Sequence, residues 1–323
     1  MTLAMRSTHP SQGIFVAGAT VLYDYIYKVD WLPQPGNVAN ILNINDNQTR
    51  HFGGTAFNIA VQLAKLGENV SLGHPVGKDF PGSDYELYLL NLGIQLENLQ
   101  ITTNERSGFA YVFFTEDGST LCFSYPTQSS NAILPKSLFK QIGLIVLTPR
   151  FSMLSQNLIK QAIELSIPVA IVGIAEESIL ELLPQTMMLS LNNHEAEHLS
   201  KALGGISVEA ITTRMPGIFY ETKGKKGCNI YQHGEMIGKV DAISPKEFVD
   251  PTGAGDSFSA GVLAGLRHGF NSIQAAQIGA TAASFILEAY GCQTKMPDWV
   301  NISERLGKHH PQLAQKIVTE LNI

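Results

Sequence analysis

The most restrictive feature of the sequence is an alternation between short apolar runs and amphipathic segments with helical spacing. The apolar runs cover residues 13–19, 70–76, 144–148, 168–172 and 187–191, and the helical segments cover 54–66, 85–92, 154–165 and 195–203. Strands that are apolar along their whole length are typical of a parallel sheet with helices on both faces. We therefore predict an α/β protein with a mostly parallel central sheet, followed by two long helices over residues 255–289.

Two stretches, residues 22–46 and 108–125, interrupt this alternation. Both are rich in β-branched and aromatic residues, and the second has turn-forming residues at 116–119. Such a turn between two strand-like runs indicates a β-hairpin. We expect these stretches to form a small β-sheet that stands off the main body, as a lid would. The alternative is that they are edge strands of the main sheet.

The composition argues against several classes of function. Hydrophobic residues make up 44% of the chain, enough for a sizeable core. The formal net charge is −6 and no basic run is longer than Lys225-Lys226, so neither nucleic acid nor a membrane is expected as a partner. The three cysteines, Cys122, Cys228 and Cys292, form no C-x-x-C pair and suit a reducing compartment. We expect a cytoplasmic globular protein without a signal peptide or a membrane-spanning segment.

Residues 250–258 (DPTGAGDSF) carry the strongest sign of chemistry. A run of small residues leads directly into a helix, so the backbone N–H groups of Ala254, Gly255 and Asp256 are expected to point at one spot. The positive end of the helix dipole makes this spot a site for an anion such as a phosphate. Asp256, at its mouth, is suited to accept a proton from an attacking hydroxyl group. The alternative is that Asp256 only caps the helix.

A second segment, residues 53–60 (GGTAFNIA), places two glycines at the start of a helix and an asparagine one turn later. Gly54 allows a substrate to approach the backbone closely. Asn58 offers both a hydrogen-bond donor and an acceptor to substrate hydroxyl groups. Taken alone, the segment also fits an ordinary helix start.

Together the two segments resemble the signatures of the PfkB carbohydrate kinase family, which includes ribokinases, fructokinases and adenosine kinases. The resemblance implies an ATP-dependent kinase that phosphorylates a substrate hydroxymethyl group, with Asp256 as the catalytic base. It also implies that the amides of Gly253, Ala254 and Gly255 stabilise the phosphoryl group during transfer.

The same resemblance implies a domain organisation. It extends over residues 13–306, which would form a single kinase domain with a ribokinase-like fold. The lid would be formed by roughly 22–46 and 108–125, and residues 307–323 would be a C-terminal helical tail.

Further matches follow the family order along the chain. Asp24 resembles the acidic ligand of the substrate hydroxyl groups, although its spacing from Gly18 is one residue longer than in ribokinases. Asn192 and Glu195 resemble the N-x-x-E motif, which implies that Asn192 lies at the ATP site and that Glu195 organises the water shell of Mg²⁺.

The nucleotide loop of the family, T-x-G-x-x-G, is matched by Thr222, Gly224 and Gly227. A hydroxyl group and glycine amides at these positions suit the phosphates of ATP. The resemblance also implies that a monovalent cation such as K⁺ can bind near Asp250 and Thr252.

Two other functions compete with a kinase. Residues 194–198 read H-E-A-E-H, a zinc metalloprotease motif in which His194 and His198 would hold the metal. The charged Glu197 and the position directly after a strand argue against it. A nucleoside or sugar sensor without catalysis is the second alternative, and the intact Asp256 argues against that function.

The acceptor is predicted from the aromatic residues of the expected lid. Strand alternation places Phe109, Tyr111 and Phe113 on one face, and Phe123 lies on the partner strand. We expect Tyr111, Phe113 and Phe123 to bind the substrate, because aromatic rings stack on a nucleobase better than on a bare sugar. The alternative is that these rings form only the core of the lid.

Residues 77–80, with the nearby Asp84 and Tyr85, and residues 285–294 resemble the corresponding stretches of bacterial adenosine kinases. They favour a ribonucleoside that is phosphorylated on its 5′-hydroxyl group, with ribose, fructose or another sugar as the alternative. A lid of this type often forms a dimer interface in the family, so we expect a monomer or a homodimer; an aromatic hairpin equally suits a cover for its own active site.

Overall fold

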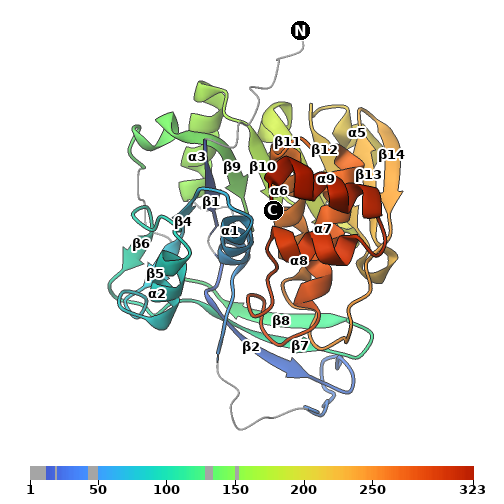
Figure 1. Ribbon diagram of the computed structural model, residues 1–323. Helices are drawn as coiled ribbons and strands as arrows, with labels where there is room; N and C mark the ends of the chain where they lie inside the picture. Colours follow the sequence, from blue (N-terminus) through green and yellow to red (C-terminus); the bar gives the residue numbers. More distant parts are fainter. Residues whose placement is uncertain (1–11, 19, 43–49, 128–133, 150–152) are drawn as a thin grey trace.

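The computed structural model describes residues 12–18, 20–42, 50–127, 134–149 and 153–323 (Figure 1). Its main sheet has eight strands in the order β14-β13-β12-β11-β10-β9-β1-β4. Their bounds are β1 (Gly13–Ala17), β4 (Val70–Gly73), β9 (Ile142–Leu147), β10 (Val169–Val172), β11 (Thr186–Asn192), β12 (Ile218–Thr222), β13 (Cys228–Gln232) and β14 (Glu235–Val240). All neighbours from β4 to β12 pair in parallel, and β13 and β14 add an antiparallel edge. The predicted mostly parallel sheet is confirmed.

Helices cover both faces of this sheet, as the apolar strands require. One face is covered by α1 (Thr55–Lys65), α6 (Ala254–Arg267), α7 (Ser272–Ile286), α8 (Trp299–Leu306) and α9 (Pro311–Leu321). The other face is covered by α3 (Met153–Leu165), α4 (Asn193–Ala202) and α5 (Val208–Thr212), with the 3-10 helix η2 (Glu177–Gln185). Figure 1 shows α1, α7, α8 and α9 in front of the sheet and α3 at its upper left. The helix α9, within the predicted tail, buries Leu313 and Ile317 in the core.

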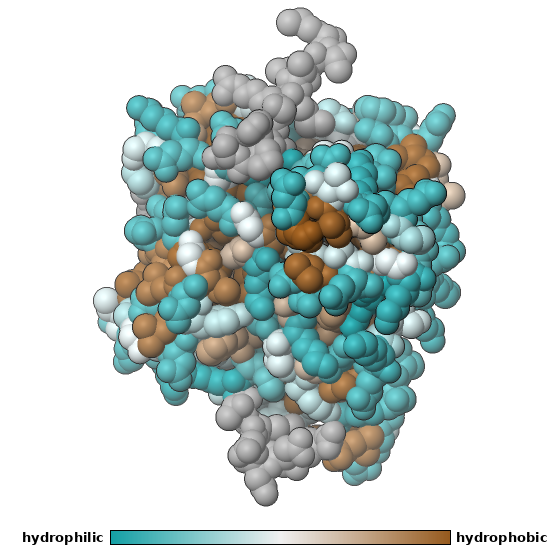
Figure 2. Space-filling model, viewed as in Figure 1, coloured by the Kyte–Doolittle hydropathy of each residue, from teal (hydrophilic) through white to brown (hydrophobic). Residues whose placement is uncertain are grey.

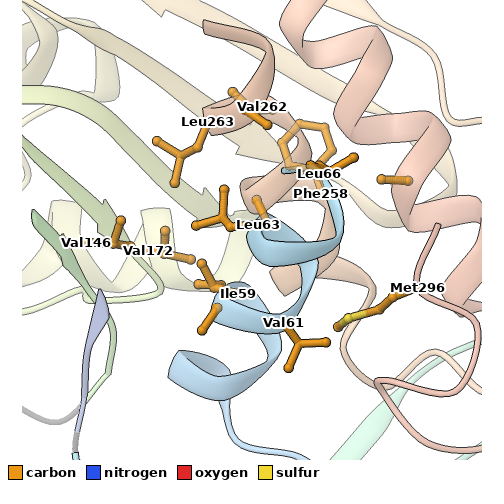
Figure 3. Packing of buried hydrophobic residues seen from close by; sticks show 14 of the residues in the cluster. Ile59, Val61, Leu63, Leu66, Val146, Val172, Phe258, Val262, Leu263 and Met296 are labelled. Carbon is orange, nitrogen blue, oxygen red and sulfur yellow. The ribbon is translucent and has the colours of Figure 1, made fainter. Parts of the chain in front are cut away.

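The core that carries the site lies between α1, α6 and the sheet. Figure 3 shows Ile59 and Leu63 of α1 close to Val146 and Val172 of the sheet and to Leu263 of α6. Each such fully buried aliphatic side chain contributes about 1.5–3 kcal/mol to folding. This packing fixes the two helices relative to each other, and with them the residues at their N-terminal ends.

The stretches predicted as a lid form a separate small sheet, not edge strands of the main one. Its order is β3-β2-β7-β8, with β2 (Tyr23–Lys28), β3 (His51–Phe52), β7 (Phe109–Phe114) and β8 (Thr120–Tyr125). Figure 1 shows β2, β7 and β8 below the main body. Strands β7 and β8 form the expected hairpin. Residues 29–42 contribute only an isolated bridge between Val29 and Ile41, and residues 43–46 lie outside the described residues.

One predicted strand is wrong in its extent. Residues 70–76 are divided into β4 and β5 (Pro75–Gly77), and β5 pairs with β6 (Gln100–Thr102) beside α2 (Asp84–Asn91). The break falls at His74, whose buried ring accepts from the N–H of Thr20 through Nε2 at 2.9 Å. The following Pro75 has no N–H to donate to a strand ladder. The chain therefore changes sheets at this point.

The face of the molecule in Figure 2 is mostly hydrophilic, with small hydrophobic areas. In the described part of the chain, no helix has both the length and the apolar character to cross a membrane.

Candidate active site

The start of α6 has the geometry of an anion site. Gly253 precedes the helix with φ 83°, and its carbonyl oxygen accepts from the N–H of Ser257 at 3.0 Å. A Cβ at Gly253 would lie 2.6 Å from the Cβ of Cys292, so only glycine fits both the conformation and the space. The Ala254 N–H bonds the Pro251 carbonyl at 3.3 Å, which takes it away from the predicted anion site. The amides of Gly255 and Asp256 belong to the first turn, whose N–H groups have no intrahelical partner.

Asp256 is the third residue of α6 and not its cap. It is half-buried, and its Oδ2 accepts from Nδ2 of Asn58 at 2.7 Å. The pKa of Asp256 is raised to about 7: burial is the main cause, the nearby Asp24 and Glu195 act in the same direction, and the hydrogen bond from Asn58 acts against them. A carboxylate with a pKa near neutral is suited to accept a proton from a substrate hydroxyl.

The glycine pair at the start of α1 makes room for Asp24. A Cβ at Gly53 would overlap the Asp24 carboxylate, and one at Gly54, where φ is 87°, would overlap the carbonyl of Val21. The structure therefore explains both glycines by contacts within the chain. Burial raises the pKa of Asp24 to about 6, and Sγ of Cys292 donates to its Oδ2 at 3.4 Å. Asp24 and Asp256 thus act electrostatically on the same site.

Asp250 is a third buried carboxyl group in this region. Its Oδ1 accepts from the N–H of Thr252 at 2.9 Å and its Oδ2 from the N–H of Gly291 at 3.0 Å. Burial raises its pKa, and the nearby His51 lowers it. Asp250 thereby fastens the loop before α6 to the segment that carries Cys292.

Beside the start of α6 lies a cavity of about 190 Å³. Its lining residues are Thr55, Pro149, Val172, Gly173, Ser190, Leu191, Asn192, Glu195, Thr222, Gly253, Gly255, Asp256 and Ser259. Asn192 and Glu195 form a capping box on α4: Oδ1 of Asn192 accepts from Glu195 N at 2.9 Å, and Oε2 of Glu195 from Asn192 N at 2.8 Å. The cavity therefore joins the predicted nucleotide residues to Asp256.

The predicted nucleotide loop follows β12. Thr222 lines the cavity, but Gly224 and Gly227 do not. These two glycines bound the turn η3 (Gly224–Lys226), which the Lys223 N–H closes on the carbonyl of Gly227 at 2.7 Å. They shape the loop around Thr222.

Tyr111, Phe113 and Phe123, the predicted substrate contacts, do not lie on the same face of the small sheet as Asp24. Asp24 pairs in register with Ala110, so strand alternation places these three rings on the opposite face of the small sheet. Tyr111 stacks on Tyr25 with ring centroids 5.2 Å apart, and Phe123 is 60% exposed. The rings lie on the outer face, away from Asp24.

The face on Asp24's side is lined by apolar residues that sequence reasoning did not select. Buried residues there, with two partly buried aromatics packed on them, are Val21, Ile26, Ala110, Val112, Phe114, Phe248 and Tyr290. Alternation within β7 groups Ala110, Val112 and Phe114, but only the pairing of β2 with β7 places them on the side of Asp24.

The sequence reasoning gave no site role to Gln293 or Tyr85, both buried beside Asn58. Nε2 of Gln293 donates to Oδ1 of Asn58 at 2.9 Å and to the Tyr85 hydroxyl at 2.6 Å. Both belong to stretches that resemble adenosine kinases, but no local pattern gives them a role, because their partners are distant in the sequence.

The zinc motif has no support from the side-chain positions. His194 and His198 are exposed, and Glu195 is engaged in the capping box. Within the described ranges, no group of three His, Cys, Asp or Glu side chains is placed to hold a metal ion.

Comparison with known proteins gives consistent matches over most of the chain. The family model described as pfkB family carbohydrate kinase matches residues 11–299. A nucleoside kinase of Methanocaldococcus jannaschii is 33% identical over 305 residues, which are 92% of this chain and 97% of that protein. The crystal structure of the M. jannaschii nucleoside kinase, described as an archaeal member of the ribokinase family, superposes with a TM-score of 0.75 and covers 92% of this chain and 99% of its own.

Two solved structures at lower identity share the fold. The nucleoside kinase of Burkholderia thailandensis in complex with inosine has a TM-score of 0.79 at 20% identity and covers 93% of this chain and 98% of its own. The ribokinase of Arabidopsis thaliana complexed with ribose and ATP has a TM-score of 0.71 at 21% identity, with 92% and 99% covered.

Proposed function

The chain belongs to the pfkB family of carbohydrate kinases and is an ATP-dependent phosphotransferase with a ribokinase-like fold, and we propose that it phosphorylates the 5′-hydroxyl group of a ribonucleoside such as adenosine. The observation that carries the proposal is the 33% identity to a nucleoside kinase along 97% of that protein. Relatives described as ribokinases match less closely, the Bacillus subtilis enzyme being 25% identical over 79% of this chain.

The apolar face on Asp24's side supports a nucleoside acceptor. Ala110 and Val112 are small, and they lie on the same face as Asp24. A ribose hydroxyl pair bound to Asp24 would place an attached base over this apolar face, where burial of its ring is favourable. This argument replaces the one from Tyr111, Phe113 and Phe123.

Phosphoryl transfer is then assigned to residues around the start of α6. Asp24 and Asn58 orient the acceptor hydroxyl groups, and Asp256 takes the proton from the attacking 5′-hydroxyl. The oxygen forms a bond to the γ-phosphorus of ATP as the bond to the bridging oxygen of ADP breaks. The amides of Gly255 and Asp256 stabilise the negative charge on the transferring group. Gly253 forms the turn that precedes them.

The nucleotide is assigned to the cavity lined by Asn192, Glu195 and Thr222. Glu195 fits a Mg²⁺ ion held through water, because one carboxylate oxygen is used in the capping box and the other faces Gly173 at the cavity wall. Mg²⁺ would neutralise charge that develops on the phosphates. Asp250 and Thr252 fit a K⁺ ion, since a cation there would offset the charge of the buried carboxyl groups.

The small sheet is proposed as the lid of a single domain over residues 13–306. Asp24 and the apolar face belong to it, so movement of this sheet would enclose the acceptor and exclude water.

The proposal is tested by measuring ADP formation from ATP and Mg²⁺ with adenosine, other nucleosides, ribose, fructose and fructose 6-phosphate. We expect the highest kcat/KM with a nucleoside, and product analysis should place the phosphate on the 5′-oxygen. Glu320→Gln, at an exposed position of α9, serves as a handling control. Turnover of sugars alone would overturn the acceptor and keep the kinase.

A further inference from the structure

A directed chain of hydrogen bonds ends at the proposed general base. The hydroxyl of Tyr85 donates to the carbonyl oxygen of Gly53 at 2.9 Å and accepts from Nε2 of Gln293 at 2.6 Å. The same NH₂ group donates to Oδ1 of Asn58 at 2.9 Å. Nδ2 of Asn58 then donates to Oδ2 of Asp256 at 2.7 Å. Tyr85, Gln293 and Asn58 are buried, and Asp256 is half-buried at the cavity wall, so water has little access to the first three of these bonds.

The donor and acceptor roles in this series of hydrogen bonds are fixed at Tyr85, the end away from Asp256. A backbone carbonyl can only accept, so the single hydroxyl hydrogen of Tyr85 is committed to Gly53 and the hydroxyl oxygen accepts from Gln293. The NH₂ group of Gln293 must therefore face Tyr85 and Asn58. Oδ1 of Asn58 is the acceptor of the next bond, which leaves its NH₂ group for the carboxylate. A rotated Asn58 amide would bring its oxygen against that carboxylate.

We infer that Gln293, held by Tyr85, is a positioning residue: it fixes the side-chain amide of Asn58 so that its NH₂ group keeps the carboxylate of Asp256 in place as the general base. The inference rests on the proposed function, because the base belongs to that reaction. Gln293 and Tyr85 touch neither the reacting atoms nor the nucleotide cavity, so they act through Asn58.

The surroundings of Asp256 explain why such a device is needed. Burial raises the pKa of its carboxyl, and Asp24 on β2 and Glu195 on α4 raise it further. The thiol of Cys292 is a further buried group within electrostatic range, and burial raises its pKa well above the ordinary value. The hydrogen bond from Asn58 acts in the opposite direction by stabilising the charged form. Loss of that bond would leave the carboxylate facing acidic neighbours.

The first test replaces Gln293 with methionine, which has a similar length and cannot form the hydrogen bonds. We expect kcat at pH 7 to fall about tenfold, as for the loss of one hydrogen bond to a charged group. The loss should be smaller at pH 9, because the acidic limb of the kcat–pH profile moves to higher pH. KM for ATP should stay unchanged. Tyr85→Phe is the milder second variant and should shift the profile in the same direction.

A double-mutant cycle separates positioning from simple packing. In the Asn58→Ala background, Gln293→Met should change kcat less than about twofold, because the side chain that links Gln293 to Asp256 is absent. Gln62→Met is the matched control. Gln62 is buried and lies in α1, as Asn58 does. It forms hydrogen bonds with Ser257 and Pro297 but not with Asn58, so its loss should lower Tm and leave the pH profile unchanged.

The kinetic tests use whichever acceptor the wild-type protein phosphorylates fastest, so turnover of sugars alone would refute the nucleoside but not this inference. The inference is overturned if Gln293→Met keeps the wild-type pH profile, or if its effect adds fully to that of Asn58→Ala. A test without activity uses Asp256→Asn at pH 8. The rise in Tm that it causes should be larger in the Gln293→Met background, and an equal rise would overturn the inference.

Discussion

Replacing Asp256 with asparagine should make the folded protein more stable while it stops phosphoryl transfer. Asparagine keeps the shape of the side chain, and its oxygen can still accept from Nδ2 of Asn58, which lies 2.7 Å from Oδ2 of the carboxylate. The substitution removes a buried charge that faces Asp24 and Glu195. It also removes the carboxylate that the proposed mechanism uses as the general base.

The size and the pH dependence of the effect follow from the pKa of Asp256. Burial raises this pKa from 3.8 to about 7. Between these values the folded state keeps a proton that the unfolded chain has lost, so the free energy of unfolding falls as pH rises through the window. At about 1.4 kcal/mol for each unit, the charged carboxyl costs at most about 4 kcal/mol at pH 8. About 1.4 kcal/mol of this arises between pH 6 and pH 8.

The assay is urea unfolding of the wild type and Asp256→Asn at pH 6 and pH 8, with linear extrapolation to water. We expect the variant to be more stable at both values, and its advantage to be about 1.4 kcal/mol larger at pH 8. Asp24 is present in both proteins, so its own titration largely cancels. In parallel, kcat should fall about a thousandfold or more, with KM for ATP little changed. Equal stabilities at pH 8, or near-normal turnover, would refute the reasoning.

Three further substitutions address other parts of the molecule. Asp24→Asn should raise KM for the acceptor at least about tenfold and that for ATP less than about twofold, because a neutral amide accepts hydroxyl groups less strongly than a carboxylate; an unchanged acceptor KM in steady-state assays would contradict the role of Asp24. Gly253→Ala should lower the free energy of unfolding by about 1–3 kcal/mol, because φ is 83° and Cys292 occupies the space; urea unfolding identical to wild type would count against it. We expect a second copy of the chain to cover the outer aromatic face, where Tyr111 is 40% and Phe123 60% exposed. Phe123→Ser should then convert a dimer to a monomer in light scattering, and a monomeric wild type would disprove this.

Local sequence patterns predicted most of the fold because their causes are short-range. Buried parallel strands need continuous apolar residues, and α1, α3 and α4 each follow from helical spacing within a single segment. The anion site at the start of α6 was predicted for the same reason, since it depends on Gly253 and the residues directly after it. The strand expected over residues 70–76 failed because His74 bonds to a distant loop.

Local patterns did not predict which face of the small sheet lies toward Asp24. Alternation correctly grouped Phe109, Tyr111 and Phe113 on one face, but it carried no information on which face meets the substrate. Only the pairing of β2 with β7 places Asp24 on the side of Ala110 and sends the aromatic rings outward.

The sequence by itself determined the fold class, the glycine turn at the start of α6 and the place of Asp256 in its first turn, because each depends on neighbouring residues. Tertiary structure alone decided the environment of that carboxylate. Its hydrogen bond to Asn58 spans 198 residues, and the bonds of Gln293 to Asn58 and Tyr85 span 235 and 208. Such contacts exist only after α1, α2 and α6 have packed together, since their geometry depends on the whole fold and not on any local period.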